Sequence, residues 1–302
     1  MPGPTLIAVP NVSEGADAAV LAAVGAAFSA GAGAGLLCEP HADPDHGRAV
    51  FTLAGLPGHL APALLAGARV AVERIDLRAH RGLHPHVGAV DVVPVVHLDD
   101  ARRGAACAEA LVVADMLADV LELPVFLYGA LAGGRTRAEL RRGGIAELTR
   151  RMRGGELTPD FGPREPHPTA GAALVAARPP LVAFNVELAP PASLEDARRI
   201  AALIREGGEE GLPAVRAIGL TLARRAGVAQ VSTNVEDPGR VALAEVVAAI
   251  ARHAPVTETE LVGLAPSAAF EGFPAGLTCR NRATIEETLQ RRREAGTTDA
   301  PP

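Results

Sequence analysis

The chain has 302 residues, 48% of them hydrophobic, which is enough for one large domain or two medium ones. A net charge of −6, 3% aromatic residues and the absence of tryptophan argue against a nucleic-acid partner. The chain contains no lysine, which excludes a lysine Schiff base and a P-loop lysine. Any bound anion must therefore meet arginine, histidine or backbone amides.

Residues 1–15 carry no basic stretch before their short apolar run, so no secretory signal is expected. Residues 20–37 are uncharged, but alanine and glycine predominate, and we expect a helix and a glycine turn there instead of a membrane span. Cys38, Cys107 and Cys279 lie far apart in sequence, which fits a reducing compartment and argues against a zinc-thiolate site. We therefore expect a cytoplasmic protein that does not bind membranes.

Apolar patterns in the first part of the chain predict alternating strands and helices. The expected strands are 5–10, 35–39, 48–55, 90–98 and 123–128. The expected helices are 17–30, 60–74 and 99–121. A polar loop is expected at 41–46, a partly helical stretch rich in glycine and arginine at 129–153, and a loop rich in proline and glycine at 158–171.

The second part of the chain continues in the same style. The expected strands are 172–177, 180–188, 212–224, 227–234 and 256–264. Ser193 is expected to cap a helix that ends near residue 206, and Asp237, followed by Pro238, a helix that ends near residue 253. The alternation is irregular and no strand precedes a G-x-G-x-x-G motif, which predicts an α+β fold of two lobes. We expect boundaries at 1–178 and 179–270, with a partly disordered tail at 271–302 that ends in small polar residues.

The segment from residue 78 to residue 94 contains the strongest chemical signal. Three histidines and two arginines occur within nine residues, framed by glycines and prolines that favour turns. Histidine changes its charge near neutral pH, so a loop of this kind can aim an imidazole at a substrate. His84, next to Pro85, is the candidate general acid and base; the alternative is a loop histidine held by backbone hydrogen bonds.

Other polar groups leave alternatives open. The histidines and aspartates at 41–46, together with those of the histidine-rich segment, supply metal-type ligands, but no tight ligand spacing exists and plain turn chemistry explains them equally. Residues 11–15 present a ligand-binding turn or an ordinary capping turn. The glycines at 129–134 with Arg135 and Arg137 form an anion site or a surface turn. Tyr128 lines a pocket or belongs to the core.

Taken in order, these segments resemble the formiminotransferase domain family. The resemblance rests on V-P-N-V-S-E-G at 9–15, D-P-D-H-G-R at 43–48 and T-L-A-G at 52–55. It continues with the run from Ile75 to Pro94, L-P-V-F-L-Y-G at 123–129, P-D-F-G-P at 159–163 and G-A at 171–172. It ends with A-F-N-V at 183–186, A-I-G at 217–219, A-Q-V-S-T-N at 229–234 and E-L-V-G-L at 260–264.

The resemblance implies N- and C-terminal subdomains, each a mostly antiparallel or mixed sheet with helices packed on it, and a ligand groove between them. It implies an enzyme that transfers the formimino group of N-formimino-L-glutamate to the co-substrate tetrahydrofolate without a metal. It also implies a cytoplasmic homodimer that takes part in histidine catabolism. It makes His84 the catalytic residue. It assigns substrate and folate binding to a larger set, namely Asn11, Ser13, His41, Arg48, His80, Tyr128, Gly162, Pro163, Gly171, Gly211 and Leu212.

Four positions differ from the family pattern. Leu83 replaces a glutamate, His86 an arginine, His41 an aspartate that would partner the catalytic histidine, and Ala170 a bulky residue. Because both substrates carry glutamate carboxylates, the candidates to bind them are the arginines at 48, 78, 81 and 135. Two alternative functions remain open: a folate-binding paralogue with altered or lost activity, and a metal-dependent hydrolase built on the histidines and aspartates.

Overall fold

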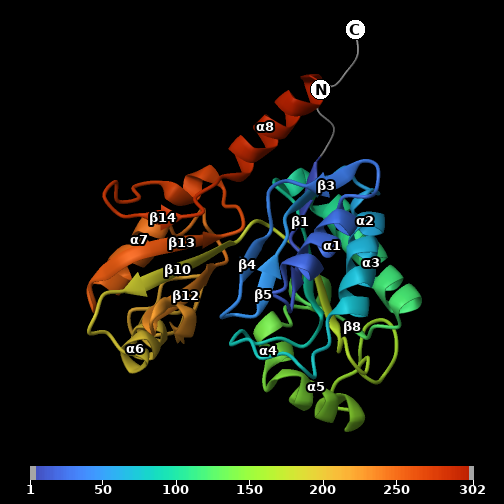
Figure 1. Ribbon diagram of the computed structural model, residues 1–302, viewed down its shortest axis with the longest axis horizontal. Helices are drawn as coiled ribbons and strands as arrows, with labels where there is room; N and C mark the ends of the chain where they lie inside the picture. The colour runs from blue at the N-terminus through green and yellow to red at the C-terminus, as the bar shows by residue number, and fades with distance from the viewer. Residues whose placement is uncertain (1–4, 299–302) are drawn as a thin grey trace. The chain divides into compact units, whose positions relative to one another are not determined.

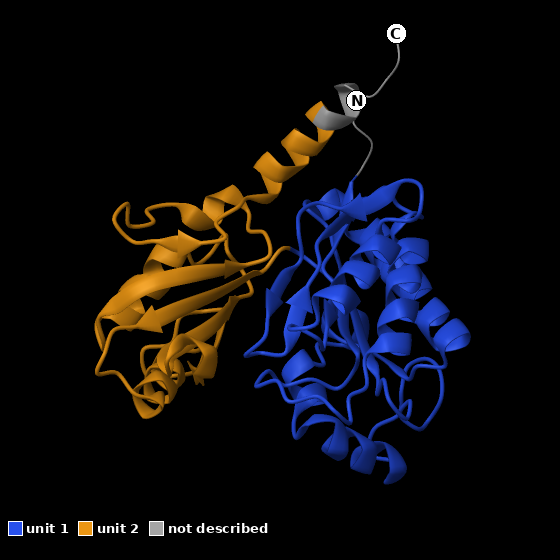
Figure 2. Cartoon of the chain, in the orientation of Figure 1, with its two compact units in different colours: residues 1–179 blue, residues 180–302 orange. Residues whose placement is uncertain are grey.

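The chain forms two compact units, residues 1–179 and 180–302 (Figure 2). The computed structural model describes residues 5–298 (Figure 1). Each unit has its own sheet with helices packed against it, which confirms the predicted α+β class. None of the helices within residues 5–298 is both long enough and apolar enough to cross a membrane.

Unit 1 is built on a mixed sheet of nine strands. They are β1 (Leu6–Ala8), β2 (Asn11–Val12), β3 (Ala34–Leu36), β4 (His41–Asp43), β5 (Arg48–Val50), β6 (Leu53–Gly55), β7 (Val90–Val96), β8 (Val125–Leu127) and β9 (Ala173–Arg178). The order β3-β6-β1-β7-β2-β5-β4 is antiparallel. On its other edge β7 pairs in parallel with β9, which pairs in parallel with β8. The central strand β7 is therefore buried along its whole length.

Helices cover both faces of this sheet. On one face lie α1 (Ala18–Phe28), α2 (Leu60–Arg74) and α3 (Arg103–Leu121), which follows a short 3-10 turn at Asp100–Arg102 (Figure 1). The buried residues of α2 recur every three or four positions, the spacing that places an apolar stripe on one side of a helix. On the other face, α4 (Arg137–Arg141) and α5 (Gly144–Arg153) bury Leu140, Leu148 and Met152 against β7, β8 and β9.

Two expectations for residues 41–55 were wrong. The expected polar loop at 41–46 contains β4, because the turn that follows it closes a hairpin with β5, with Asp43 opposite Arg48. The Asp43 carboxylate accepts the N–H groups of Asp45 and His46 within this turn. The expected single strand at 48–55 is two strands, because β5 pairs with β2 and β6 pairs with β1, and Pro10 separates those two partners.

Unit 2 is built on a five-stranded sheet in the order β11-β12-β10-β13-β14. The strands are β10 (Val182–Leu188), β11 (Val215–Leu222), β12 (Val228–Val235), β13 (Val256–Val262) and β14 (Cys279–Arg280). Only the pairing of β13 with β14 is parallel in the described sheet. Helices α6 (Leu194–Ile204) and α7 (Leu243–Ala251) pack on one face and bury a separate core.

The structure confirms one predicted helix cap in unit 2 and corrects another. Ser193 caps α6: its Oγ accepts the N–H of Asp196 at 3.2 Å. The helix expected from Asp237 begins only at Leu243, because Pro238 and the glycine after it form a turn in which the Asp237 carbonyl accepts two N–H groups. The Glu245 carboxylate accepts the N–H of Ala242 instead, at 3.0 Å.

Residues 271–298 contain more structure than the expected tail. Strand β14 extends the sheet, and α8 (Ile285–Thr298) follows. The Thr284 hydroxyl accepts the N–H of Glu287 in the first turn, and the helix begins with acidic side chains that favour its N-terminus. Disorder was expected at the end of the small polar stretch 297–302; α8 includes residues 297 and 298, and residues 299–302 lie outside the described residues.

Candidate functional site

The predicted catalytic loop, here called the histidine segment (residues 76–89), contains no helix and no regular strand. Its backbone is fixed to the turn between β4 and β5, where Leu83 N–H donates to the carbonyl of Asp45 and His84 N–H to that of His46. The two segments meet at glycines: a Cβ on Gly82 would lie 2.2 Å from the His46 carbonyl oxygen. Only glycine permits this approach, which places His84 beside β5.

His84 contacts Arg48, which projects from the first position of β5. Nη1 of Arg48 lies 2.7 Å from Nε2 of His84. Because a guanidinium can only donate, Nε2 is the acceptor and the ring is neutral with its proton on Nδ1. Burial lowers the pKa of His84 well below its usual value, and the positive charges of Arg48 and Arg141 lower it further. The site therefore holds a neutral imidazole, which is the form that acts as a base.

Arg48 belongs to a group of guanidiniums. Burial lowers its pKa to about 9, and repulsion from Arg141 and Arg137 of α4 contributes. Arg141 is itself buried and forms an ion pair with Asp91, which is 1% exposed on β7. Asp91 also accepts the N–H of Val87 at 2.8 Å, so one buried carboxylate fixes both α4 and the end of the histidine segment. Positive charge therefore exceeds negative charge around His84.

The remaining histidines of this region have structural contacts. His46 pairs with Asp43. Burial alone would raise the pKa of Asp43, but the hydrogen bonds and the charge of His46 outweigh it and lower this pKa to about 2. Nδ1 of His80 contacts the carbonyl of Ser13 at 3.1 Å, and its ring packs edge-on against His86, with centroids 4.1 Å apart. His86, where the family pattern has arginine, thus supports the segment.

The predicted binding residues at the start of the chain are occupied by backbone contacts. Asn11 donates from Nδ2 to the carbonyl of Val9 at 2.9 Å, and the Ser13 hydroxyl donates to the carbonyl of Gly88 at 2.7 Å. His41 lies on β4, two residues before Asp43. These contacts fit the alternative reading of residues 11–15 as a structural turn that holds the histidine segment.

The predicted folate loop lies partly beside this segment. Gly171 has φ +70° and pairs with Gly88, and a Cβ there would lie 2.2 Å from the Val87 carbonyl oxygen. Gly162 has φ +81°, and a Cβ there would lie 2.4 Å from the carbonyl oxygen of Leu123, which precedes β8. Pro163 is exposed. Gly211 and Leu212 belong to unit 2, in the connection between α6 and β11, so the structure does not place them with the rest.

The other arginine candidates have partners of their own. Arg78 pairs with Asp76 at 2.6 Å on the surface. Arg81 donates to the carbonyls of Arg78 and His80. Arg135 pairs with Asp160 and donates to the Leu127 carbonyl at 2.7 Å. Arg48 and Arg81 are the two predicted carboxylate ligands that form no direct ion pair with a carboxylate within residues 5–298, and of these two Arg48 contacts His84.

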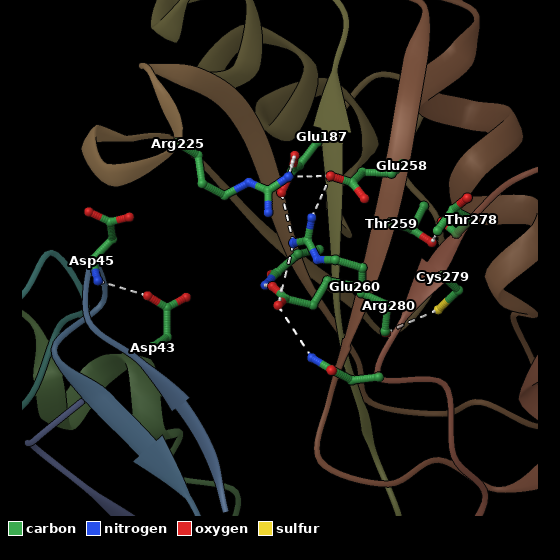
Figure 3. Close-up of polar contacts among 12 residues, drawn as sticks. Asp43, Asp45, Glu187, Arg225, Glu258, Thr259, Glu260, Thr278, Cys279 and Arg280 are labelled. Carbon is green, nitrogen blue, oxygen red and sulfur yellow. Dashed lines mark hydrogen bonds and ion pairs between the residues drawn. The ribbon is translucent and has the colours of Figure 1, made fainter. Parts of the chain in front are cut away.

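A second polar cluster lies on the sheet of unit 2 (Figure 3). Arg225 and Arg280 both contact Glu187, which is 2% exposed, at 3.0 Å and 2.8 Å, and both also contact Glu258. Asn185 donates to Glu260 at 3.0 Å. Asn185 and Glu260 stand in the motifs at 183–186 and 260–264, but no role was predicted for any residue of the cluster. The charges of its arginines and glutamates largely compensate one another.

No three histidine, cysteine, aspartate or glutamate side chains among the described residues are grouped to hold a metal ion. Arg141 and Asp91 lie beside His84 and Arg48, although neither was predicted as a site residue. Asp91 stands in the G-A-V-D-V motif at 88–92, which was a usable signal. Arg141 had none, because it is one of several arginines in a glycine-rich stretch.

Comparison with known proteins agrees with the two units. Residues 5–178 match the formiminotransferase domain, N-terminal subdomain, and residues 183–276 match the formiminotransferase domain. Formimidoyltransferase-cyclodeaminase of Rattus norvegicus is 37% identical over 275 residues, which cover 85% of this chain and 49% of that protein. This chain thus spans about half the length of that relative.

Two relatives have lengths closer to that of this chain. Glutamate formimidoyltransferase of Streptococcus pyogenes serotype M1 is 35% identical over 270 residues, which cover 87% of this chain and 89% of that protein. Glutamate formimidoyltransferase of Thermoplasma acidophilum is 30% identical over 273 residues, covering 87% and 88%.

Proposed function

Because the chain belongs to the formiminotransferase domain family, we propose that it transfers the formimino group of N-formimino-L-glutamate to N5 of tetrahydrofolate. The match across both subdomains carries this proposal, and the two glutamate formimidoyltransferases of similar length support it. In this proposal His84 is the general acid and base, and Arg48, which contacts it, binds a substrate carboxylate. The pathway would then be histidine breakdown in the cytoplasm.

The reaction joins N5 of tetrahydrofolate to the formimino carbon and breaks the bond from that carbon to the glutamate nitrogen. One proton leaves N5, and one proton reaches the departing amine, so the two transfers balance. A neutral His84 would accept the first proton and deliver it in the second step, returning to its starting form. Acid–base assistance of this kind contributes about a hundredfold or more in rate.

The low pKa of His84 suits the first of these steps. An imidazole that remains neutral below its usual pKa can accept a proton at neutral pH once its lone pair is free, and the imidazolium that it becomes is a strong acid toward the departing amine. The acid limb of the kcat/KM profile is therefore expected below pH 6.5.

The proposal is tested by assaying the full chain with formiminoglutamate and tetrahydrofolate, with and without a chelator. We expect turnover that the chelator does not change and that His84→Ala lowers by about a hundredfold or more. Full turnover by His84→Ala would refute the assigned role. Tetrahydrofolate binding without turnover would identify a folate-binding paralogue, and activity lost with chelator a metal-dependent hydrolase. The homodimer also stays a proposal, which sedimentation equilibrium would test.

A further inference from the structure

The charges around His84 do not balance within the described residues. Three guanidiniums, those of Arg48, Arg137 and Arg141, lie close enough to His84 to lower its pKa, and the pKa values of Arg48 and Arg141 are themselves lowered, by burial first and by neighbouring arginines as well. Of these, Arg141 alone has a direct carboxylate partner there, in Asp91. Concentrating unpaired positive charge in a partly buried place costs free energy unless an anion joins it.

Three polar atoms at this place also lack hydrogen-bond partners among the described residues. They are the Tyr128 hydroxyl, Nε of Arg141 and Nδ1 of His84, and all three atoms are buried. Tyr128 is 7% exposed and is the last residue before the 3-10 turn at Gly129–Ala132. It lies close enough to Arg141 to contribute to that group's pKa, which burial lowers most. A buried hydroxyl without a partner is costly, so an acceptor bound at this place would be stabilised by it.

We infer that Arg48, Arg137, Arg141 and Tyr128 form a binding site for a carboxylate beside His84, and that a carboxylate bound there draws Arg48 away from Nε2 of His84. The inference rests on the proposed function, which supplies the chemical class of the ligand: both substrates carry the carboxylates of a glutamate. Guanidinium groups match carboxylates in charge and in the geometry of paired hydrogen bonds.

This arrangement couples binding to the readiness of the base. Arg48 occupies the one lone pair of the neutral ring, so Nε2 cannot accept a proton while this contact lasts. A carboxylate competes for the guanidinium and brings a negative charge near the ring, and both effects raise the pKa of His84. The charged and titratable groups around the site are Arg48, His46, Arg137, Arg141, Asp43, Asp91 and His86.

The experiment measures the pKa of His84 by NMR in the full-length chain, with its ring signal assigned by its loss in His84→Gln. The probes are L-glutamate and p-aminobenzoyl-L-glutamate, which mimic the donor and the folate tail, and neutral glutaramide as a control. We expect a glutamate probe to raise the pKa, and the probe that binds at lower concentration identifies the source of the carboxylate. Glutaramide is expected to leave the pKa unchanged.

Two mild variants and one matched control test the assignment. Arg137→Gln and Tyr128→Phe are expected to weaken binding of the glutamate probe by about tenfold, the loss of one hydrogen bond to a charged group. Arg142→Gln removes an exposed arginine from the end of the same helix and is expected to leave binding unchanged. Circular dichroism establishes that each variant is folded.

The inference is overturned if neither glutamate probe moves the pKa of His84, or if Arg142→Gln weakens binding as much as Arg137→Gln. Turnover measured on the same samples separates the two proposals. Turnover with an unmoved His84 pKa refutes the carboxylate site alone, whereas a raised pKa without turnover refutes the proposed activity alone.

Discussion

Replacing Asp91 by asparagine tests whether one buried ion pair holds the site together. Asp91 is 1% exposed and Arg141 is 8% exposed, so neither group is solvated when its partner is lost. Asparagine keeps an oxygen for the Val87 N–H, but it presents no negative charge to the guanidinium. Breaking a buried pair in this way costs about 3–5 kcal/mol, which is a large part of the stability of a typical domain.

Urea unfolding followed by tyrosine fluorescence measures this loss in unit 1 alone. Tyr128 is the only tyrosine and the chain has no tryptophan, so the signal comes from one unit. Asp76→Asn, which breaks the exposed pair with Arg78, is the matched control and is expected to leave the midpoint unchanged.

A double variant tests whether the unpaired charge of Arg141 causes the loss of stability. Asp91→Asn combined with Arg141→Met is expected to recover most of the lost stability, because the unpaired buried charge is then absent. If Asp91→Asn unfolds at the same urea concentration as the parent chain, the pair does not hold the site and the argument fails.

Three further predictions concern single residues. Gly82→Ala would place a Cβ 2.2 Å from the His46 carbonyl oxygen and displace the histidine segment, so kcat is expected to fall about 10- to 100-fold. The control Gly104→Ala, whose Cβ meets nothing within 4 Å, is expected to leave kcat unchanged in the same assay. Glu109→Ala removes the buried acceptor of two N–H groups at the start of α2 and is expected to cost about 2–3 kcal/mol in urea unfolding; an unchanged midpoint would contradict this. The pKa of Asp43 falls from 3.8 to about 2 on folding, so its contribution of about 2 kcal/mol to the free energy of unfolding is complete above pH 3.8 and is lost as the pH falls toward 2. Asp43→Asn should therefore flatten the dependence of stability on pH in that range, as measured by acid unfolding.

The sequence predicted the elements whose pattern is local. Helix α2 begins and ends at the predicted residues, because its apolar stripe and its flanking turns are all contained in the segment itself. The helix expected from Asp237 was misplaced because Pro238 serves equally well in a turn and in a first helical turn, and only the buried side chains downstream decide between them. Helix α8 was missed because a charged segment without a broad apolar face resembles a solvated tail.

Within the candidate site, the sequence pointed to His84 and Arg48 but not to Arg141 or Asp91. Glycines and prolines next to His84 in the sequence predict the turns around it. Arg141, in contrast, reaches the site because α4 packs on the face of β7 that carries Asp91. Such a contact depends on tertiary packing between distant segments. Of the several arginines between residues 129 and 153, no sequence rule marks the one whose side chain turns inward.

A general base needs a neutral ring and a free lone pair, and the arginines around His84 affect these two requirements in opposite ways. Their charge lowers the pKa and keeps the ring neutral, but the nearest guanidinium also occupies Nε2. If His84 is the base, something must remove Arg48 from that atom before the proton moves. A ligand that carries its own carboxylate meets this need, since it binds the guanidinium and frees the ring in one event. A neutral amidine donor should therefore be a poor substrate even where its reacting carbon is identical.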